Sequence, residues 1–222
     1  MEKKKILLIG SRGKMGEVVK NTLQNEYLII DAKRGQNWAD FESDLIIDFG
    51  SAESSVIASE VAVKKGIPLI VGSTGQSEIQ RQKIELASKQ VPVLMAGNFS
   101  IGMAVFRKLV REVLKIKVDD IAIFEKHHKA KKDSPSGTAI ELLHMAEKLS
   151  DIRPQVLSER GGKEIGTHTI DFYFGDEVLS VKHQAFSRQA FADGVLLAVE
   201  YFLKGQNARL YYFDEIINFF CE

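Results

Sequence analysis

The 222-residue sequence predicts an α/β protein with a Rossmann-type parallel-sheet domain and a second, α+β domain. Three observations lead to this prediction. Short apolar runs alternate with polar helical stretches through the first half, a glycine-rich turn follows the first apolar run, and the alternation stops after Ser100. A chain of this length buries enough apolar surface for one full domain and a smaller companion.

Five strands are predicted in the first half of the chain, at residues 5–9, 27–31, 45–48, 68–71 and 91–95. Several of these runs are apolar on successive residues, which is typical of strands that helices cover on both faces. The stretches between them predict surface helices near residues 15–24, 53–65 and 77–89. This alternation of strands and helices predicts a parallel sheet.

After Ser100 the sequence predicts a different arrangement. The expected elements are a helix to about residue 115, a strand at 120–126, a polar loop, a helix at 136–149 and an antiparallel hairpin of strands 167–174 and 177–185. Residues 151–164, with Pro154, Gly161 and Gly162, are predicted to form a long loop. A helix at 191–203 and the segment from 210 onward then return to the first domain. The predicted domains are residues 1–98 with 188–222, and residues 99–187.

Charge and composition argue against several classes of protein. Because 30 Lys and Arg residues balance 30 Asp and Glu residues, we expect no global attraction to nucleic acid or to an anionic membrane. We find no apolar run of membrane-spanning length, and the first strand begins too close to Met1 for a signal peptide. A single cysteine, Cys221, excludes a disulfide framework. The expected location is therefore the cytoplasm.

A glycine-rich turn, Gly10-Ser11-Arg12-Gly13-Lys14-Met15-Gly16, joins the first predicted strand to the first helix. Glycines permit a tight turn and let the backbone approach a pyrophosphate, while the helix N-terminus supplies free amides. The spacing departs from the standard Gly-x-Gly-x-x-Gly pattern, and a turn that binds no ligand is the alternative. Its place between a strand and a helix favours a dinucleotide site.

Charged residues after the second strand bear on which dinucleotide binds. Asp31 lies where an acidic residue binds the adenosine ribose hydroxyls of NAD. Lys33 and Arg34 follow, and such cations pair with the 2′-phosphate of NADP. A solvated cluster of loop charges is the alternative. The pattern favours NADPH, with NADH also possible.

Two further turns fall at predicted strand ends, where ligands of open α/β sheets collect. They are Asp48-Phe49-Gly50-Ser51 and Gly72-Ser73-Thr74-Gly75. Small residues in these turns would let a nicotinamide lie against the backbone. Taken singly, each turn is better explained by ordinary turn chemistry.

The segment from Glu125 to Ala139 combines a strand, a cationic loop and a helix start. Ser136, Gly137 and Thr138 stand at the expected helix N-terminus, which favours an anion such as a carboxylate. His127 suits proton transfer near neutral pH, and Lys131 could bind a carboxylate or assist the proton. This pattern predicts a site for a small dicarboxylate beside a hydride donor.

Two alternatives apply to the same segment. His127 and His128 could bind a metal, but neighbouring strand residues point to opposite faces and no third ligand has suitable spacing, so we expect no metal. The lysine run could be a solvated or nucleic-acid-binding loop, although it lacks interleaved aromatic residues.

Several motifs together resemble the 4-hydroxy-tetrahydrodipicolinate reductase family. They are the glycine turn, Gly72-Ser73-Thr74-Gly75, Asn98-Phe99-Ser100-Ile101-Gly102, the 125–139 segment, His183, and Ser187-Arg188-x-x-Phe191-Ala192-x-Gly194. The block Glu125-x-His127-His128-x-x-Lys131-x-Asp133-x-Pro135-Ser136-Gly137-Thr138-Ala139 is the most specific of them. The similarity spans nearly the whole chain.

The resemblance implies NAD(P)H-dependent reduction of a cyclic dicarboxylate in the diaminopimelate route to lysine, by a homotetramer. It implies His127 as proton donor with Lys131 as its partner, and a substrate site of His128, Ser136, Gly137 and Thr138. The expected cofactor-binding residues are Gly10, Arg12, Gly13, Lys14, Met15, Gly16, Lys33, Arg34, Phe49, Gly72, Ser73, Thr74, Gly97, Asn98, Phe99 and Arg188. The rival hypotheses are another NAD(P)-dependent dehydrogenase and a non-catalytic dinucleotide sensor.

Overall fold

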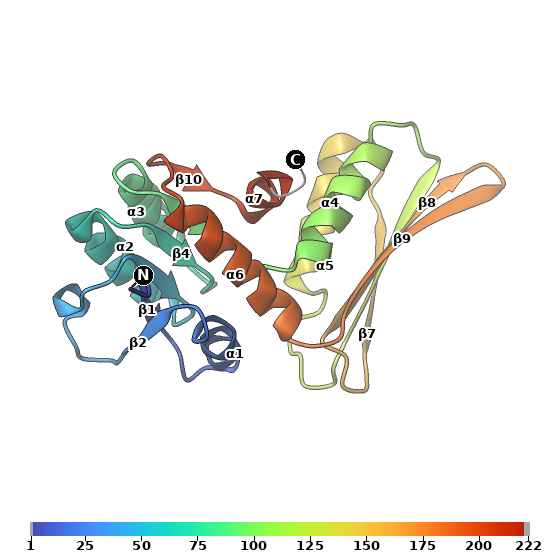
Figure 1. The fold of residues 1–222 in the computed structure, drawn as a ribbon. Coiled ribbons are helices and arrows are strands. Elements are labelled where there is room, and N and C mark those ends of the chain that lie inside the picture. Colours follow the sequence, from blue (N-terminus) through green and yellow to red (C-terminus); the bar gives the residue numbers. More distant parts are fainter. Residues whose placement is uncertain (1, 220–222) are drawn as a thin grey trace. The chain divides into compact units, whose positions relative to one another are not determined.

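A computed structural model describes residues 2–219. The chain divides into two compact units, one of residues 1–101 with 189–222 and one of residues 102–188 (Figure 1). The boundaries predicted from the sequence, after residues 98 and 187, fall slightly earlier along the chain. Cys221, the single cysteine, lies outside the described residues.

The first unit contains a six-stranded parallel sheet with the strand order β10-β5-β4-β3-β1-β2. Its strands are β1 (Lys5–Ile9), β2 (Leu28–Ala32), β3 (Leu45–Asp48), β4 (Leu69–Val71), β5 (Val93–Met95) and β10 (Leu210–Tyr211). Its helices are α1 (Lys14–Leu23), α2 (Ala52–Lys65), α3 (Glu78–Ser88), α6 (Gln189–Leu203) and α7 (Phe213–Phe219), with a short 3-10 helix, η1 (Trp38–Asp40). The predicted Rossmann-type sheet and the return of the C-terminal segment to it are confirmed.

Burial on both faces explains the apolar runs in these strands. Leu7 and Ile9 of β1 pack in one cluster with Ala58 and Val61 of α2. The intervening Leu8 points to the opposite face and is also fully buried. Because neither face of the strand meets water, successive apolar residues are all used.

Helix α6 packs closely in the first unit because it carries a glycine at position 194. A Cβ at Gly194 would lie 1.8 Å from the carbonyl oxygen of Phe99 and 2.7 Å from the ring of Phe213. Phe99 and Phe213 themselves pack ring against ring, with centroids 5.3 Å apart. The missing side chain therefore lets this helix approach the chain at the end of the first half.

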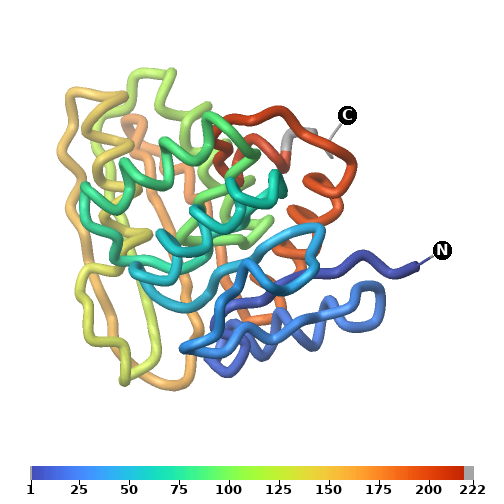
Figure 2. Tube along the Cα trace, turned by 90° about the vertical axis from the view of Figure 1, so that its left-hand side faces the viewer, coloured from blue at the N-terminus to red at the C-terminus, as the bar shows by residue number. Residues whose placement is uncertain are grey.

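The second unit contains a mixed four-stranded sheet with the strand order β7-β6-β8-β9. Its elements are α4 (Ile101–Val113), β6 (Asp120–His127), α5 (Gly137–Leu149), β7 (Gln155–Arg160), β8 (Gly166–Phe174) and β9 (Glu177–Ala185). The strands run lengthwise beside one another in the trace of Figure 2. Side chains of α4 and α5, among them Phe106, Val110 and Leu142, cover one face of this sheet.

Strand β7 corrects the sequence analysis, which predicted a long loop at residues 151–164. Residues Gln155–Arg160 instead pair in parallel with β6, from Ala122 opposite Gln155 to His127 opposite Arg160. The strand escaped prediction because it is a polar edge strand with mostly exposed side chains, between Pro154 and Gly161. Which of its side chains face the covered side of the sheet is decided by its pairing with β6, and the sequence does not reveal that pairing.

None of the helices among residues 2–219 is long and apolar enough to cross a membrane. Across the same residues there is no group of three His, Cys, Asp or Glu side chains arranged to hold a metal ion.

We predict that Gly194→Ala destabilises the first unit by about 1–3 kcal/mol, because the added methyl group overpacks against the Phe99 carbonyl. Thermal and urea unfolding measure this change. Gly97→Ala is the matched control, because its Cβ would meet only the Thr74 side chain, at 3.6 Å. Equal stability of the two variants would contradict the packing argument.

Candidate functional site

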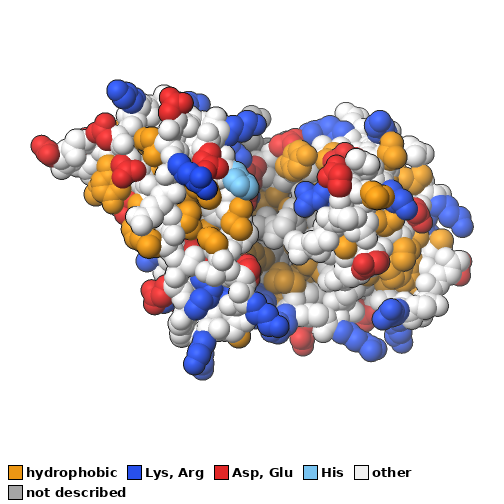
Figure 3. All heavy atoms as spheres, turned by 180° about the vertical axis from the view of Figure 1, so that it is seen from behind, with side chains coloured by type: hydrophobic (Ala, Val, Ile, Leu, Met, Phe, Trp, Pro, Cys, Tyr) orange, Lys and Arg blue, Asp and Glu red, His pale blue; other side chains and the backbone are white. Residues whose placement is uncertain are grey.

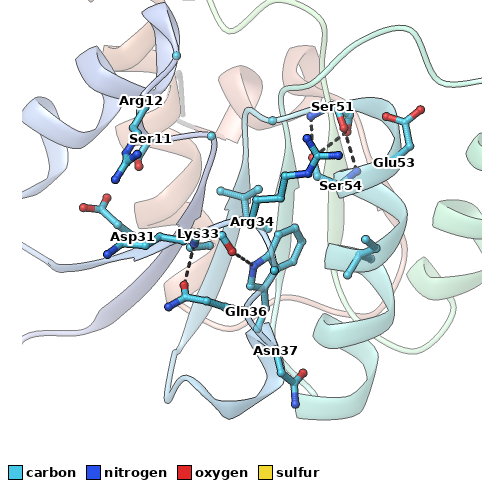
Figure 4. A pocket seen from close by; sticks show the side chains of 18 of the residues that line it. Ser11, Arg12, Asp31, Lys33, Arg34, Gln36, Asn37, Ser51, Glu53 and Ser54 are labelled. Carbon is cyan, nitrogen blue, oxygen red and sulfur yellow. Dashed lines mark hydrogen bonds between the residues drawn. The ribbon is translucent and has the colours of Figure 1, made fainter.

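The first unit has a cavity of about 1350 Å³ at the carboxyl ends of β1, β2 and β3. It is lined by the turn after β1, the segment after β2 and the start of α2 (Figure 4). Gly10, Arg12, Gly13, Lys33 and Arg34 all line it. Five of the predicted cofactor-binding residues, from two separate segments, therefore meet at one cavity.

The glycine turn brings the start of α1 against the end of β1. Gly10 has a φ of +78°, which favours glycine, and its carbonyl accepts a hydrogen bond from the Gly13 amide at 3.0 Å. A Cβ at Gly16 would lie only 2.1 Å from that carbonyl oxygen. Gly16 thus permits close packing of the helix on the turn.

The first turn of α1 has amides that no side chain caps. Its N-cap residue is Gly13, whereas α2 begins with a capping box in which Ser51 and Ser54 bond to each other's backbone. Uncapped amides at a helix N-terminus favour an anion. Lys14, Met15 and Gly16 contribute to this turn through their backbone.

Asp31 of β2 lines the same cavity and pairs with Lys20 of α1, with 2.5 Å between Nζ and Oδ2. Burial raises the pKa of Asp31, but hydrogen bonds from Lys20 and Ser11 outweigh burial and lower it. The other carboxylate oxygen, Oδ1, is buried and has no partner among the described residues. This oxygen is free to accept a hydrogen bond from a ligand hydroxyl.

Two cations at the cavity remain available for an anion. Within residues 2–219, neither Lys33 nor Arg34 forms an ion pair with an acidic side chain. Arg12 lines the same cavity from the turn after β1 (Figure 4). The orphaned Asp31 oxygen, the uncapped turn and these cations fit a dinucleotide, with hydroxyl, pyrophosphate and 2′-phosphate groups.

Other predicted cofactor-binding residues lie at the ends of β3, β4 and β5 but do not line this cavity. They are Phe49, Gly72, Ser73, Thr74, Gly97, Asn98 and Phe99. The ring of Phe49 occupies the space beside Gly72, where a Cβ would meet it at 2.4 Å. Arg188 is the last residue of the second unit.

A buried carboxylate holds these strand ends together. Asp48 is fully buried and accepts hydrogen bonds from the hydroxyls of Ser54 and Ser73, each at 2.6 Å, and from the Gly50 amide at 3.0 Å. Burial is the largest influence on Asp48 and raises its pKa. The Ser73 hydroxyl is therefore engaged inside the protein.

The second unit concentrates its polar residues at the carboxyl end of β6. Glu125 has a fully buried side chain, and its carboxylate contacts His127 Nδ1. Arg160 of β7 binds both carboxylate oxygens of Glu125, at 2.9 and 2.6 Å. The same guanidinium donates to the Asp133 carbonyl at 2.7 Å, which ties the loop before α5 to the sheet.

The charges in this cluster follow from their partners. Burial raises the pKa of Glu125, but hydrogen bonds from Arg160, Ser158 and His127 outweigh it and lower the pKa to about 2. Burial lowers the pKa of His127, while Glu125 raises it and Lys131 lowers it. The cluster therefore holds an anionic Glu125 beside a histidine whose proton is loosely held.

Ser136 is the N-cap of α5 and is engaged within the protein. Its hydroxyl accepts from the Ala139 amide and bonds to His168 Nε2, both at 3.2 Å, and its amide donates to Glu125. Burial lowers the pKa of His168 to about 3, so this ring is neutral at pH 7. The next two amides, of Gly137 and Thr138, have no partner among the described residues, as expected for a helix start.

Lys131 and His128 lie on the loop that follows β6. Lys131 pairs with Asp133, with 2.8 Å between Nζ and Oδ2, and its charge is close enough to act on His127. His128 donates its backbone amide to the Glu164 carbonyl at 2.8 Å. Lys131, Ser136 and His127 are thus brought together, while His128 lies beside them on the loop.

Sequence reasoning assigned no role to three residues of these clusters. Lys20 and Arg160 each pair with an acid far along the chain, and a sequence does not reveal such partners. His168 left a usable signal, because it occupies a covered-face position of the predicted strand 167–174. A buried histidine in an alternating strand needs a polar partner.

Comparisons with known proteins agree with this geometry. Family models described as dihydrodipicolinate reductase, N-terminus and C-terminus, match residues 30–99 and 102–217. The 4-hydroxy-tetrahydrodipicolinate reductase of Rickettsia bellii is 36% identical over 239 residues, covering 96% of this chain and 95% of that protein. The enzyme of that name from Bdellovibrio bacteriovorus is 35% identical over 224 residues, covering 98% and 97%.

A solved structure shares the fold. The dipicolinate-bound dihydrodipicolinate reductase from Paenisporosarcina sp. TG-14 superposes with a TM-score of 0.78 at 20% identity, covering 95% of this chain and 98% of that one. Both family models and the near-full-length relatives point the same way, and the chain belongs to the dihydrodipicolinate reductase family.

Proposed function

We propose that this protein catalyses the NAD(P)H-dependent reduction of 4-hydroxy-tetrahydrodipicolinate to tetrahydrodipicolinate, in the diaminopimelate route to lysine. Near-full-length similarity to reductases of that name carries the proposal. The two residue clusters support it, because one fits a dinucleotide and the other fits an anion beside a proton donor. The proposed location is the cytoplasm.

The cavity of the first unit is the proposed cofactor site. NAD(P)H, when bound, supplies the hydride for the reaction. The uncapped amides of α1 bind its pyrophosphate, and Asp31 Oδ1 accepts from a ribose hydroxyl. Lys33 and Arg34 bind the 2′-phosphate of NADPH, while NADH needs neither.

The second unit is the proposed substrate domain. The Gly137 and Thr138 amides bind one substrate carboxylate at the N-terminus of α5, and Lys131 and His128 contribute further polar contacts. Ser136 acts by capping the helix and presenting those two amides. Two substrate carboxylates thus meet donors and positive charge.

His127 is the proposed proton donor. Burial lowers its pKa, so only a minor fraction of the free protein carries the second ring proton at pH 7. A bound dianion raises that pKa, because an opposite charge nearby favours the imidazolium. Binding of the substrate therefore favours protonation of His127, which then donates the proton that the reaction consumes. Lys131 helps to hold the dianion beside His127.

The purified protein should oxidise NADPH or NADH only when freshly prepared aldolase product is added. His127→Gln and Lys131→Gln should each lower turnover by about 100-fold or more, because acid-base residues typically contribute at least that much. Absorbance of the reduced cofactor measures turnover. Lys129→Gln, an exposed lysine of the same loop, is the control that should keep full activity.

The same assay separates this proposal from its rivals. A dinucleotide sensor would bind the cofactor without consuming it, and a different dehydrogenase would ignore the aldolase product. Full activity in both the His127 and the Lys131 variants would refute the proposed roles of these residues.

Replacing Lys33 and Arg34 together by glutamine should weaken NADPH binding by about tenfold or more and leave NADH binding nearly unchanged. Loss of charge-assisted bonds to an exposed phosphate costs about 1.5 kcal/mol or more. Cofactor fluorescence titration measures both dissociation constants, and NADH serves as the internal control. An equal loss for both cofactors would place the 2′-phosphate elsewhere.

We also propose a homotetramer, assembled through the face of the second sheet that α4 and α5 leave uncovered. Phe124 is paired directly with Leu157 on this face, and they are 37% and 44% exposed. Val178, on the same face, is 52% exposed. Figure 3 shows apolar side chains at the surface of the second unit among charged ones. Association would remove this apolar area from water.

A Phe124→Lys, Leu157→Lys double variant should dissociate the assembly, because like charges would replace the apolar contact. Sedimentation velocity measures the mass. Ile79→Lys, which alters a more exposed apolar residue on α3, is the control and should leave the mass unchanged. A tetramer that survives the double change would rule out this face.

A further inference from the structure

Glu125 carries a buried charge, and the proposed reaction described above gives it no role. Its carboxylate makes four close contacts with three residues, which are His127 of the same strand, Arg160 of β7 and Ser136 at the start of α5. One oxygen contacts His127 Nδ1 and Arg160 Nη1, and the other contacts Arg160 Nη2 and the Ser136 amide. A buried carboxylate is costly unless it is fully paired, so this arrangement fixes its position closely.

We propose that Glu125, clamped by Arg160, is the positioning residue that orients His127 for proton transfer. In this arrangement Nδ1–H donates to Glu125 and Nε2 is the nitrogen that exchanges the proton with substrate. The inference rests on the proposed function, because it assumes that His127 is the proton donor. It adds a reason why this ring presents one nitrogen and not the other.

The tautomer follows from the partners of the two ring nitrogens. An ionised carboxylate only accepts hydrogen bonds, so the nitrogen facing Glu125 must carry a proton. The Glu125 pKa of about 2 keeps the carboxylate ionised throughout the working range. Neutral His127 therefore bears its proton on Nδ1 and leaves a lone pair on Nε2.

A glycine keeps the Nε2 side of the ring open. A Cβ at Gly166 would lie 2.9 Å from His127 Nε2 and 3.2 Å from its Cδ2. The neutral His168 ring stands nearly perpendicular to His127, with centroids 5.1 Å apart. The ring is thus held on its Nδ1 edge and flanked by His168, and Gly166 lies beside the edge with the reacting nitrogen.

Arg160 gives the same clamp a second effect. Besides its two bonds to Glu125, it donates to the Asp133 carbonyl on the loop that carries Lys131. One guanidinium therefore sets the proton donor and the proposed substrate loop against the same sheet. Lysine cannot reproduce this, because it lacks the planar fork of donors.

The charged groups around His127 predict the sign of a pH effect. Glu125 of β6 favours the imidazolium, whereas Arg160 of β7 and Lys131 of the loop oppose it, as does burial. His168 of β8 is neutral. Removing the Glu125 charge lowers the pKa of His127, so activity that needs its protonated form is lost at lower pH.

Glu125→Gln tests the positioning role with two independent measurements. We expect kcat to fall by about 100-fold, with KM for the substrate within about threefold, because the amide NH₂ favours the wrong tautomer. The alkaline limb of the pH–kcat profile should move to lower pH. Glu112→Gln, which removes a carboxylate of α4 from its exposed pair with Lys115, should match the unaltered protein in every respect.

NMR of the imidazole nitrogens, without cofactor or substrate, reads the tautomer directly. The protein has five histidines, and the spectrum of His127→Gln assigns the relevant signals. In the unaltered protein we expect a protonated Nδ1 and an unprotonated Nε2 at high pH. In Glu125→Gln the proton should move to Nε2 and the titration midpoint to lower pH.

Two conservative variants complete the test. Gly166→Ala leaves Glu125 and Arg160 in place but sets a methyl group against Nε2, so it should lower kcat although the fold is kept. Arg160→Lys keeps the charge but frees the Asp133 carbonyl, so it should raise KM as well as lower kcat. If Glu125→Gln fails to fold, the Gly166→Ala and Arg160→Lys measurements decide the question.

The outcomes separate this inference from the function on which it rests. Full activity of His127→Gln would overturn the proton-donor assignment itself. If His127 is essential but Glu125→Gln keeps the tautomer and the pH profile, the positioning role is wrong. Unaltered kcat in a folded Gly166→Ala protein would likewise overturn it.

Discussion

The geometry of the polar cluster in the second unit depends on one ion pair, between the buried carboxylate of Glu125 and the guanidinium of Arg160. It joins two parallel strands at their carboxyl ends and reaches the loop before α5 through the Asp133 carbonyl. A buried ion pair is weak evidence for stability, because desolvation offsets most of the attraction. Its worth here is geometric. Because the carboxylate of Glu125 is fixed in place, its contacts with the His127 ring and the Ser136 amide fix the positions of these two residues.

In the first unit, Asp48 is the buried carboxylate that fixes the positions of neighbouring segments. It too is fully buried at the end of a parallel strand, but its donors are two serine hydroxyls and an amide instead of a guanidinium. Without a cation, burial prevails and raises the Asp48 pKa, whereas Arg160 brings that of Glu125 down. The same side-chain chemistry thus yields a structural acid at one site and a fixed anion beside a histidine at the other.

The predictable parts of this protein are those that depend on local pattern. Continuous apolar runs predicted the parallel strands, and Gly10 to Gly16 predicted a tight turn. In that turn a Cβ at Gly16 would lie only 2.1 Å from the Gly10 carbonyl oxygen, so glycine is required there. Strand β7 was missed because its polar residues gain a covered face only beside β6. For the same reason Arg160 could not be assigned, since its acid lies 35 positions away in the sequence. Long-range pairing of charges leaves no periodic signal.

The helix starts show how the fold separates anion sites from ordinary helix ends. Helices α2 and α3 close their first turns with capping boxes, through Ser51 with Ser54 and Ser77 with Gln80. Helix α1 has a glycine there and no side-chain cap. Helix α5 lies between these cases, because its N-cap serine bonds to the third amide and its own amide is taken by Glu125. The amides of Gly137 and Thr138 therefore remain unpaired among the described residues and point out of the helix along its dipole. A single carboxylate has two oxygens, so it can accept hydrogen bonds from both amides.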